Sequence, residues 1–391
     1  MNSRIFWVAA LFFTLLATSQ TYQPAYGSIV AQASQQNITN LVTTFANFGV
    51  KYRNTAAQAN TLEWLKDQYE SYGYQASQIE ELPFTYSGAT CKNLVVTKTG
   101  TAYPDTYVII CGHYDTVNGP GANDNGSGVS VILETARLLQ NVPTEYSIKF
   151  VHFAGEEDGL IGSQHYVNTV VNGTTPKMNI KLVFNIDQVG GVAGEVNNTI
   201  TCERDLSNPT SNNGASNLRT NELRNCVELY SDLNTVVSNA YGSDYVPFEN
   251  NGEIITGFYE TNESPYPHSA NDVVANMDPT FVYQVAKAAT GALLHFAVAC
   301  TNCNLGGMSY QMPQLVAWPI PASHELNINL GEFAAGEVFI RVLDVNGKQL
   351  MEQHASALET YKLDVSGLST GVYLLTAEGD GKVLRRRFAV K

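Results

Sequence analysis

The chain has 391 residues, of which 44% are hydrophobic and only 15% are charged, so it is globular and not disordered. Its length predicts two or three domains. The formal net charge of -14 argues against nucleic acid and against anionic membrane surfaces as partners, because both would repel an acidic protein.

The N-terminal residues have the features of a signal peptide. Arg4 precedes an apolar run from Ile5 to about Ala17, and small residues that suit cleavage follow. We therefore predict a signal peptide over residues 1–19, with an alternative cleavage site after Gly27. The other interpretation is a transmembrane anchor, which is disfavoured because the run is shorter than the roughly 20 residues that a span needs.

Strand and helix patterns alternate over residues 28–303, the first predicted domain. The predicted strands are 92–100, 106–115, 147–157, 180–191 and 253–260, and the predicted helices are 37–75, 126–140, 160–171, 223–241 and 278–300, the last with Asp278 as its N-cap. This alternation implies an α/β fold with a mostly parallel central sheet between two layers of helices.

The pattern changes after Cys303. Residues 304–318 contain Pro and Gly and are predicted to be a linker. From 319 to 391 short alternating strands are separated by turn signals such as Asn346-Gly347, and we predict a small C-terminal β-sandwich.

Export would place the six cysteines in an oxidising environment. We predict one disulfide between Cys202 and Cys226, which flank a polar loop, and another between Cys300 and Cys303. A redox-active pair is less suitable at the second position, because the pair follows a helix instead of opening one.

Polar side chains follow the predicted strands of the first domain. These residues are His113, Asp115, Asp124, Glu156, Glu157, Asp187 and His268. They should gather at one edge, because ligands bind at the carboxyl ends of parallel strands. Imidazole and carboxylate without thiolate suit zinc in a catalytic site, and two histidines with three carboxylates fit two metal ions bridged by one carboxylate.

The adjacent Glu156 and Glu157 follow a buried strand directly. One of them can bind a metal ion while its neighbour addresses the metal-bound water. Without cations the cluster would repel itself and some carboxyl pKa values would rise. The alternative for such a pair is a solvated turn.

Five segments carry a family resemblance. GHYDT at 112–116, GANDNGSGV at 121–129, FAGEEDGLIGSQHYV at 153–167, FNIDQVG at 184–190 and YPHSANDVVANMDP at 266–279 resemble the M28 family of co-catalytic zinc aminopeptidases, over roughly residues 40–300. The resemblance implies the zinc exopeptidase fold and two zinc ions per chain. It places His113 and Asp187 on one ion and Glu157 and His268 on the other, bridged by Asp124.

The same resemblance assigns the remaining roles. Glu156 would be the general base for a metal-bridging water that attacks the first peptide bond, and Asp115 would orient His113. The peptide bond between Asp124 and Asn125 would be cis. The substrates would be peptides with a free N-terminus, and we expect a monomer.

Two departures from the family pattern lie near the expected site, and one of them is His268-Ser269-Ala270 where the family usually has His-Thr-Pro. The chain has Ser-Asp-Tyr at 243–245 where the family often has Ser-Asp-His, so Asp244 matches and Tyr245 does not. Phe258 and Tyr259 are candidates for the side-chain pocket, with core aromatic residues as an equal alternative.

The tail from Trp318 resembles the C-terminal sorting domain of the type IX secretion system of Bacteroidota, most specifically between Leu363 and Leu375. The resemblance implies a secretion machinery as partner and a secreted or cell-surface location. A carbohydrate- or protein-binding β-module is the alternative.

Three functions stay open. The first is a secreted di-zinc aminopeptidase. The second is a glutaminyl cyclase, a single-zinc acyltransferase on the same fold, which the SDYVPF segment at 243–248 favours and the compact GEEDGLIGS segment at 155–163 opposes. The third is a non-catalytic binding protein, although such relatives typically lose ligands and none is missing here.

Overall fold

The computed structural model describes residues 20–300 and 315–391, apart from 316, 332, 334–335, 345–347, 357–359 and 380–381. The predicted signal peptide over 1–19 and most of the predicted linker lie outside these residues. The chain divides into two compact units, with the boundary at residues 302 and 303. Each unit has its own hydrophobic core.

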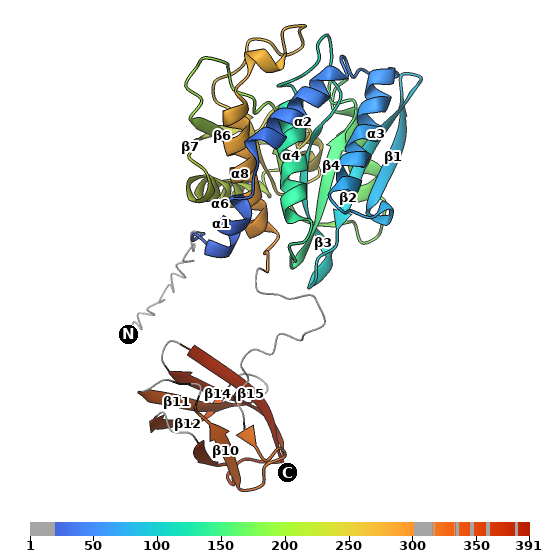
Figure 1. The fold of residues 1–391 in the computed structure, drawn as a ribbon. Helices are drawn as coiled ribbons and strands as arrows, with labels where there is room; N and C mark the ends of the chain where they lie inside the picture. The colour runs from blue at the N-terminus through green and yellow to red at the C-terminus, as the bar shows by residue number, and fades with distance from the viewer. Residues whose placement is uncertain are drawn as a thin grey trace, which may run out of the picture. The chain divides into compact units, whose positions relative to one another are not determined.

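The first unit is built on one eight-stranded sheet with the order β1-β2-β4-β3-β5-β8-β6-β7 (Figure 1). The strands are β1 Ile79–Tyr86, β2 Ala89–Lys98, β3 Tyr103–His113, β4 Tyr146–Phe153, β5 Asn179–Ile186, β6 Thr199–Arg204, β7 Asn234–Asn239 and β8 Ile255–Glu260. The four central strands β4, β3, β5 and β8 run parallel, and β2 and β6 pair with them antiparallel. The predicted α/β fold is therefore found, with antiparallel additions at both sides.

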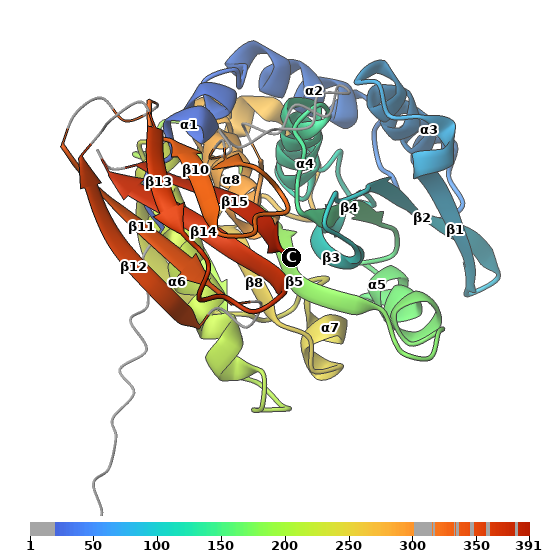
Figure 2. The same ribbon diagram turned by 90° about the horizontal axis from the view of Figure 1, so that it is seen from below.

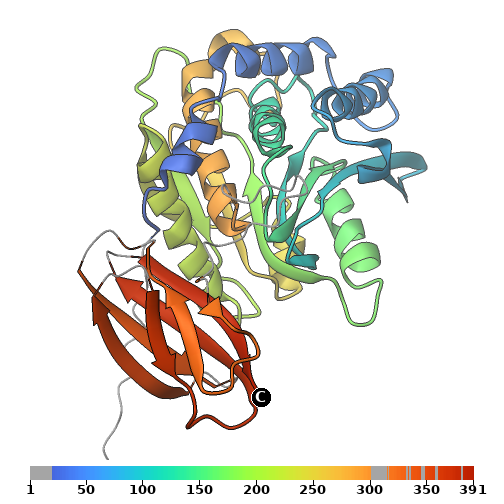
Figure 3. The same cartoon turned by 60° about the horizontal axis from the view of Figure 1, so that its bottom comes forward.

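Helices cover both faces of this sheet. The larger core includes residues of α1 Pro24–Val30, α2 Gln35–Asn47, α3 Ala56–Ser71, α4 Gly126–Leu139, α6 Asn213–Tyr230 and α8 Pro279–Phe296. A second core on the opposite face includes residues of α5 Ile161–Tyr166 and α7 Val246–Asn250. Figures 2 and 3 show these two layers on either side of the strands. As predicted, Asp278 caps α8 by accepting the backbone N–H groups of Thr280 and Phe281.

Two predicted helices are wrong in part. The predicted helix over 37–75 is two helices, because the chain turns between them with positive φ angles of 77° at Gly49 and 62° at Asn54. Thr55 then starts α3 by accepting the N–H of Gln58. The predicted helix over 223–241 ends at Tyr230, and the following Asn-Thr-Val-Val segment forms the edge strand β7 instead.

The predicted disulfide between Cys202 and Cys226 is wrong. Both thiols are free and fully buried in the larger core, where they pack as small apolar groups from β6 and α6. The predicted bridge from Cys300 to Cys303 lies outside the described residues, because Cys303 is not described. The alternative signal cleavage site after Gly27 falls inside α1.

The second unit contains two small antiparallel sheets, in agreement with the predicted β-sandwich. One sheet has the order β13-β10-β9 and the other β12-β11-β14-β15. The strands are β9 Ala317–Trp318, β10 Glu325–Asn329, β11 Glu337–Leu343, β12 Gln349–Ser356, β13 Thr360–Asp364, β14 Gly371–Gly379 and β15 Lys382–Val390.

Within the residues that the structure describes, no helix combines the length and apolarity needed to cross a membrane.

Candidate metal centre

The candidate ligands lie at the ends of the four parallel strands. His113 is the last residue of β3, and Asp187 directly follows β5. The pair Glu156 and Glu157 follows β4, and His268 lies in the loop after β8. Asp124 lies just before α4. Since the four strands run in the same direction, their ends bring these loops to one edge of the sheet.

Asp124 lies between the two histidines. Its Oδ1 is 3.2 Å from Nε2 of His113, and its Oδ2 is 3.2 Å from Nε2 of His268. A second carboxylate faces each imidazole: Asp187 Oδ1 is 3.2 Å from His113 Nε2, and Glu157 Oε2 is 2.9 Å from His268 Nε2. The five side chains thus form two groups of donors that share Asp124. The expected cis peptide bond between Asp124 and Asn125 is confirmed.

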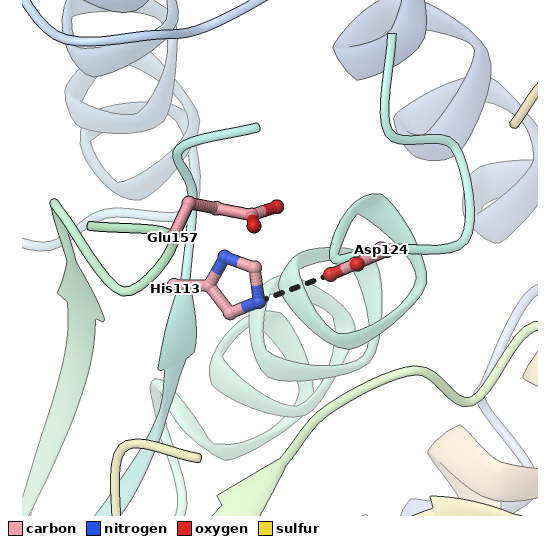
Figure 4. Close-up of side chains that lie close together, drawn as sticks. All are labelled: His113, Asp124 and Glu157. Carbon is pink, nitrogen blue, oxygen red and sulfur yellow. Dashed lines mark ion pairs between the residues drawn. The ribbon is translucent and has the colours of Figure 1, made fainter. Parts of the chain in front are cut away.

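Figure 4 shows His113, Asp124 and Glu157 directed at one small space. One ligand atom from each of these three residues lies within 4.8 Å of the others. Metal–donor bonds of about 2.0–2.2 Å in a tetrahedral arrangement keep donor atoms about 3.4 Å apart. Glu157 Oε1 is buried and has no hydrogen-bond partner among the described residues. These three donors therefore fit a metal ion, and a cation would satisfy the unpaired oxygen.

Burial and crowding shift the pKa values of the clustered groups. Burial raises the pKa of Glu156 to about 10 and that of Glu157 to about 8, with repulsion from neighbouring carboxylates adding to the effect. The hydrogen bond with Asp124 raises the pKa of His268 to about 9. Burial opposes ionisation of Asp124 too, but hydrogen bonds from His113 and His268 outweigh it and lower its pKa to about 2. The carboxyl pKa values of Glu156 and Glu157 are thus raised, as expected for crowded carboxylates without a neutralising charge.

Asp115 contacts the site through two different groups. Its backbone carbonyl oxygen is 3.1 Å from Nδ1 of His113, whereas its carboxylate is 3.8 Å from that nitrogen. The carboxylate instead accepts the backbone N–H groups of Glu156 and Glu157, both at 3.2 Å. The main chain at Asp115 therefore orients His113, and its side chain fixes the turn that carries the two glutamates.

Ser243 is a residue that the sequence analysis did not assign. Its hydroxyl donates to Oδ2 of Asp187 at 2.6 Å and accepts from Nδ2 of Asn185 at 2.8 Å. The only signal in the sequence was its place beside Asp244. The carboxylate of Asp244 is fully buried, and burial raises its pKa to about 7. Ser243 therefore orients a candidate ligand, while Asp244 is a buried carboxyl beside it in the chain.

The three aromatic candidates differ in position. Tyr245 is buried, and its hydroxyl donates to the backbone carbonyl of Tyr241. Phe258 is fully buried and packs against Phe184 at 5.1 Å, so it belongs to the core and cannot line a pocket. Tyr259 is half-buried, and its ring lies 6.3 Å from that of the exposed Tyr241. Of the predicted pocket residues, only Tyr259 reaches the surface.

Comparison with known proteins identifies the family. The model of peptidase family M28 matches residues 93–293, slightly more than half of the chain. The chain belongs to peptidase family M28. The M28 match contains every candidate ligand. A second model, described as a secretion system C-terminal sorting domain, matches residues 316–391, so the M28 domain is followed by a sorting domain.

Individual relatives agree with this assignment. The M28 domain is 32% identical over 216 residues to aminopeptidase YwaD of Bacillus subtilis (strain 168), an alignment of 53% of this chain and 45% of that protein. It is 28% identical over 195 residues to a probable zinc metalloprotease of Pyrenophora teres f. teres (strain 0-1), covering 43% and 41%. The chain thus spans less than half the length of these relatives.

A solved structure shares the fold of the M28 domain. The crystal structure of the Legionella pneumophila LapA aminopeptidase superposes with a TM-score of 0.62 at 22% identity, over 76% of this chain and 79% of that one.

Proposed function

We propose that this M28 protein is an exported aminopeptidase that holds two zinc ions and removes N-terminal residues from peptides. The observation that carries the proposal is the position of Asp124, whose two carboxylate oxygens each face a different imidazole at 3.2 Å. A single carboxylate shared by two donor groups is the arrangement that a metal pair requires. The names of the relatives, an aminopeptidase and a probable zinc metalloprotease, support both the reaction and the metal.

Five residues would hold the ions. His113 and Asp187 would bind one ion, and Glu157 and His268 would bind the other. Asp124 would bind both. A bound zinc pair would supply a Lewis acid and a water molecule of lowered pKa.

The chain's own residues would transfer the proton and leave the site open to the substrate. Glu156 would accept a proton and pass it to the leaving amine, and the two backbone hydrogen bonds at Asp115 keep its turn in place. His268 exposes 56% of its side chain, so peptides would approach the site from its side. Asp187 and His113 are almost fully buried at the opposite end.

The second unit concerns the cellular location of the protein. We propose that the sorting domain, which matches residues 316–391, directs the M28 domain to the secretion machinery and to a secreted or cell-surface location. A signal peptide over 1–19 would begin this route. The domain limits proposed from the sequence, 28–303 and 319–391, are compatible with the two compact units.

One set of measurements tests the proposal. Purified full-length chain is assayed for zinc per chain, for hydrolysis of a panel of aminoacyl anilides, and for cyclisation of a peptide with an N-terminal glutamine. Two zinc ions and anilide hydrolysis are the expected result. One zinc ion with pyroglutamate formation would replace the proposal with the cyclase alternative, and no turnover of either substrate would favour the binding-protein alternative.

A further inference from the structure

The connection between α2 and α3, Phe48–Thr55, carries two cations two residues apart, Lys51 and Arg53. They reach two different loops of the metal centre. We propose that this α2–α3 connection positions the metal centre: Lys51 fixes the loop that carries Asp124, and Arg53 fixes the loop that carries Glu157. The inference rests on the proposed metal site, but it can be tested without metal.

Lys51 is buried beside the first of these loops. Its side chain is 0% exposed, and its Nζ donates to the carbonyl oxygens of Gly49 and Pro120, both at 2.7 Å. The ammonium group also lies 4.0 Å from the centre of the Phe45 ring. Burying a cation is costly unless it is well hydrogen-bonded, and here the bonds join the α2–α3 connection to the chain just before Asp124.

Asp272 binds the same loop at a second place, the backbone of Asn123 and Asp124. Its carboxylate accepts the backbone N–H of Asn123 at 2.7 Å and that of Asp124 at 3.0 Å. Lys51 and Asp272 are close enough for each charge to favour ionisation of the other, although burial lowers the pKa of Lys51 to about 7 and raises that of Asp272 to about 6. The loop is thus held at Pro120 by Lys51 and at Asn123 and Asp124 by Asp272.

Arg53 holds the second loop. Its guanidinium group forms an ion pair with Asp158, the residue after Glu157, and Tyr52 donates to the same carboxylate at 2.9 Å. The guanidinium lies 4.4 Å from the centre of the Tyr52 ring, so the three groups form one packed cluster. The side chains of Arg53 and Asp158 are 23% and 10% exposed.

The separation of these two loops matters because their ligands converge. Asp124 and Glu157 both approach Nε2 of His268, at 3.2 Å and 2.9 Å. Each residue lies in a connection outside the strands, so the sheet alone does not fix the distance between them. A metal site tolerates displacements of only about 0.5 Å. A single short segment anchored to both loops is suited to set that distance.

Matched residues elsewhere separate positioning from general stability. Lys149 is also a buried lysine, 8% exposed, with a hydrogen bond to Thr97 and a position 4.9 Å from the Tyr107 ring, but it touches no site loop. Arg137 is a partly exposed arginine paired with the buried Glu134 inside α4. We therefore compare Lys51→Met with Lys149→Met, and Arg53→Met with Arg137→Met.

The first measurement uses metal-free full-length protein. Hydrogen exchange followed by mass spectrometry should show faster exchange at residues 119–125 in Lys51→Met and at residues 155–159 in Arg53→Met, with neither loop affected in the two controls. Unchanged exchange in both variants, or equal acceleration in the controls, would overturn the proposal whether or not the protein is an aminopeptidase.

The second measurement is zinc affinity, from competition with a chromophoric chelator. Each of the two variants should bind zinc about 10- to 100-fold more weakly than wild type, the usual cost of losing a contact that orients ligands. The controls should stay within about twofold. Tyr52→Phe, which removes one hydroxyl from the Arg53 cluster, should weaken zinc binding in the same direction, and it serves if Arg53→Met does not fold. Wild-type affinity in all of these variants contradicts the positioning role, whereas absence of zinc binding in wild type would refute the proposed function instead.

Discussion

Replacing Ser243 by Ala tests the bond that orients Asp187. The hydroxyl donates to the Asp187 carboxylate at 2.6 Å, within the usual range for a charge-assisted O–H···O⁻ bond. Hydrogen bonds to charged groups contribute about 1.5–3 kcal/mol, which corresponds to about 10- to 150-fold in an equilibrium constant. The variant should therefore lose about that factor in affinity at the proposed metal site of His113 and Asp187. The proposed site of Glu157 and His268, on the other side of Asp124, should be nearly unaffected.

The assay is a stepwise zinc titration of the metal-free protein against a chromophoric chelator, which resolves two binding steps. Ser130→Ala is the matched control, because Ser130 is also buried and donates at 2.7 Å, but to the backbone of Gly126 within α4. Weakening of one step only in Ser243→Ala, with no change in the control, is the expected pattern. If both steps weakened equally, or neither did, the orienting role of Ser243 would be refuted.

Three further predictions follow from the site and the core. Glu156→Gln should lower kcat on an aminoacyl anilide by about 10²- to 10⁴-fold while two zinc ions remain bound, and near-wild-type turnover would remove Glu156 as the base. Chelation should abolish hydrolysis and added zinc should restore it, whereas activity that survives complete metal removal contradicts a metalloenzyme. His152 is fully buried beside the Tyr69 hydroxyl at 2.8 Å, and burial lowers its pKa to about 3. Its neutral form therefore contributes stability above pH 6.5 that is lost as the pH falls towards 3, so His152→Gln should show a shallower fall in Tm between pH 7 and pH 5. An equally steep fall would assign the acid sensitivity to other groups.

The central part of the fold could be predicted from the sequence because its strands are buried on both faces. Runs such as Val108–Cys111 are fully apolar, and helix patterns directly follow the runs of β3 and β4. The edge strands could not be predicted in this way. Strand β7 is largely exposed and contains asparagine, serine and threonine beside two valines, so neither its composition nor its period distinguishes it from the end of a helix.

The candidate ligands could be predicted for a similar reason. They are histidine and carboxylate residues close behind buried strands, and short sequence motifs at these positions are enough to predict them. The residues that hold these candidate ligands in place belong to no such motif. Ser243, Lys51 and Asp272 act through loops that the sequence places far from their contacts, and Lys51 fell inside a segment expected to be helical. Contacts of this kind depend on the path of the chain between elements, which local patterns do not specify.

The distribution of the candidate ligands over four strand ends has a kinetic consequence. The imidazoles of His113 and His268 cannot approach each other until β3 and β8 have both joined the sheet on either side of β5. Bringing these two strands together closes a long loop of chain, which costs conformational entropy and is slow. Bound ions would therefore do little to hasten folding, since their site forms late. They would mainly raise the barrier to opening, so the metal-bound protein should unfold more slowly than the metal-free protein.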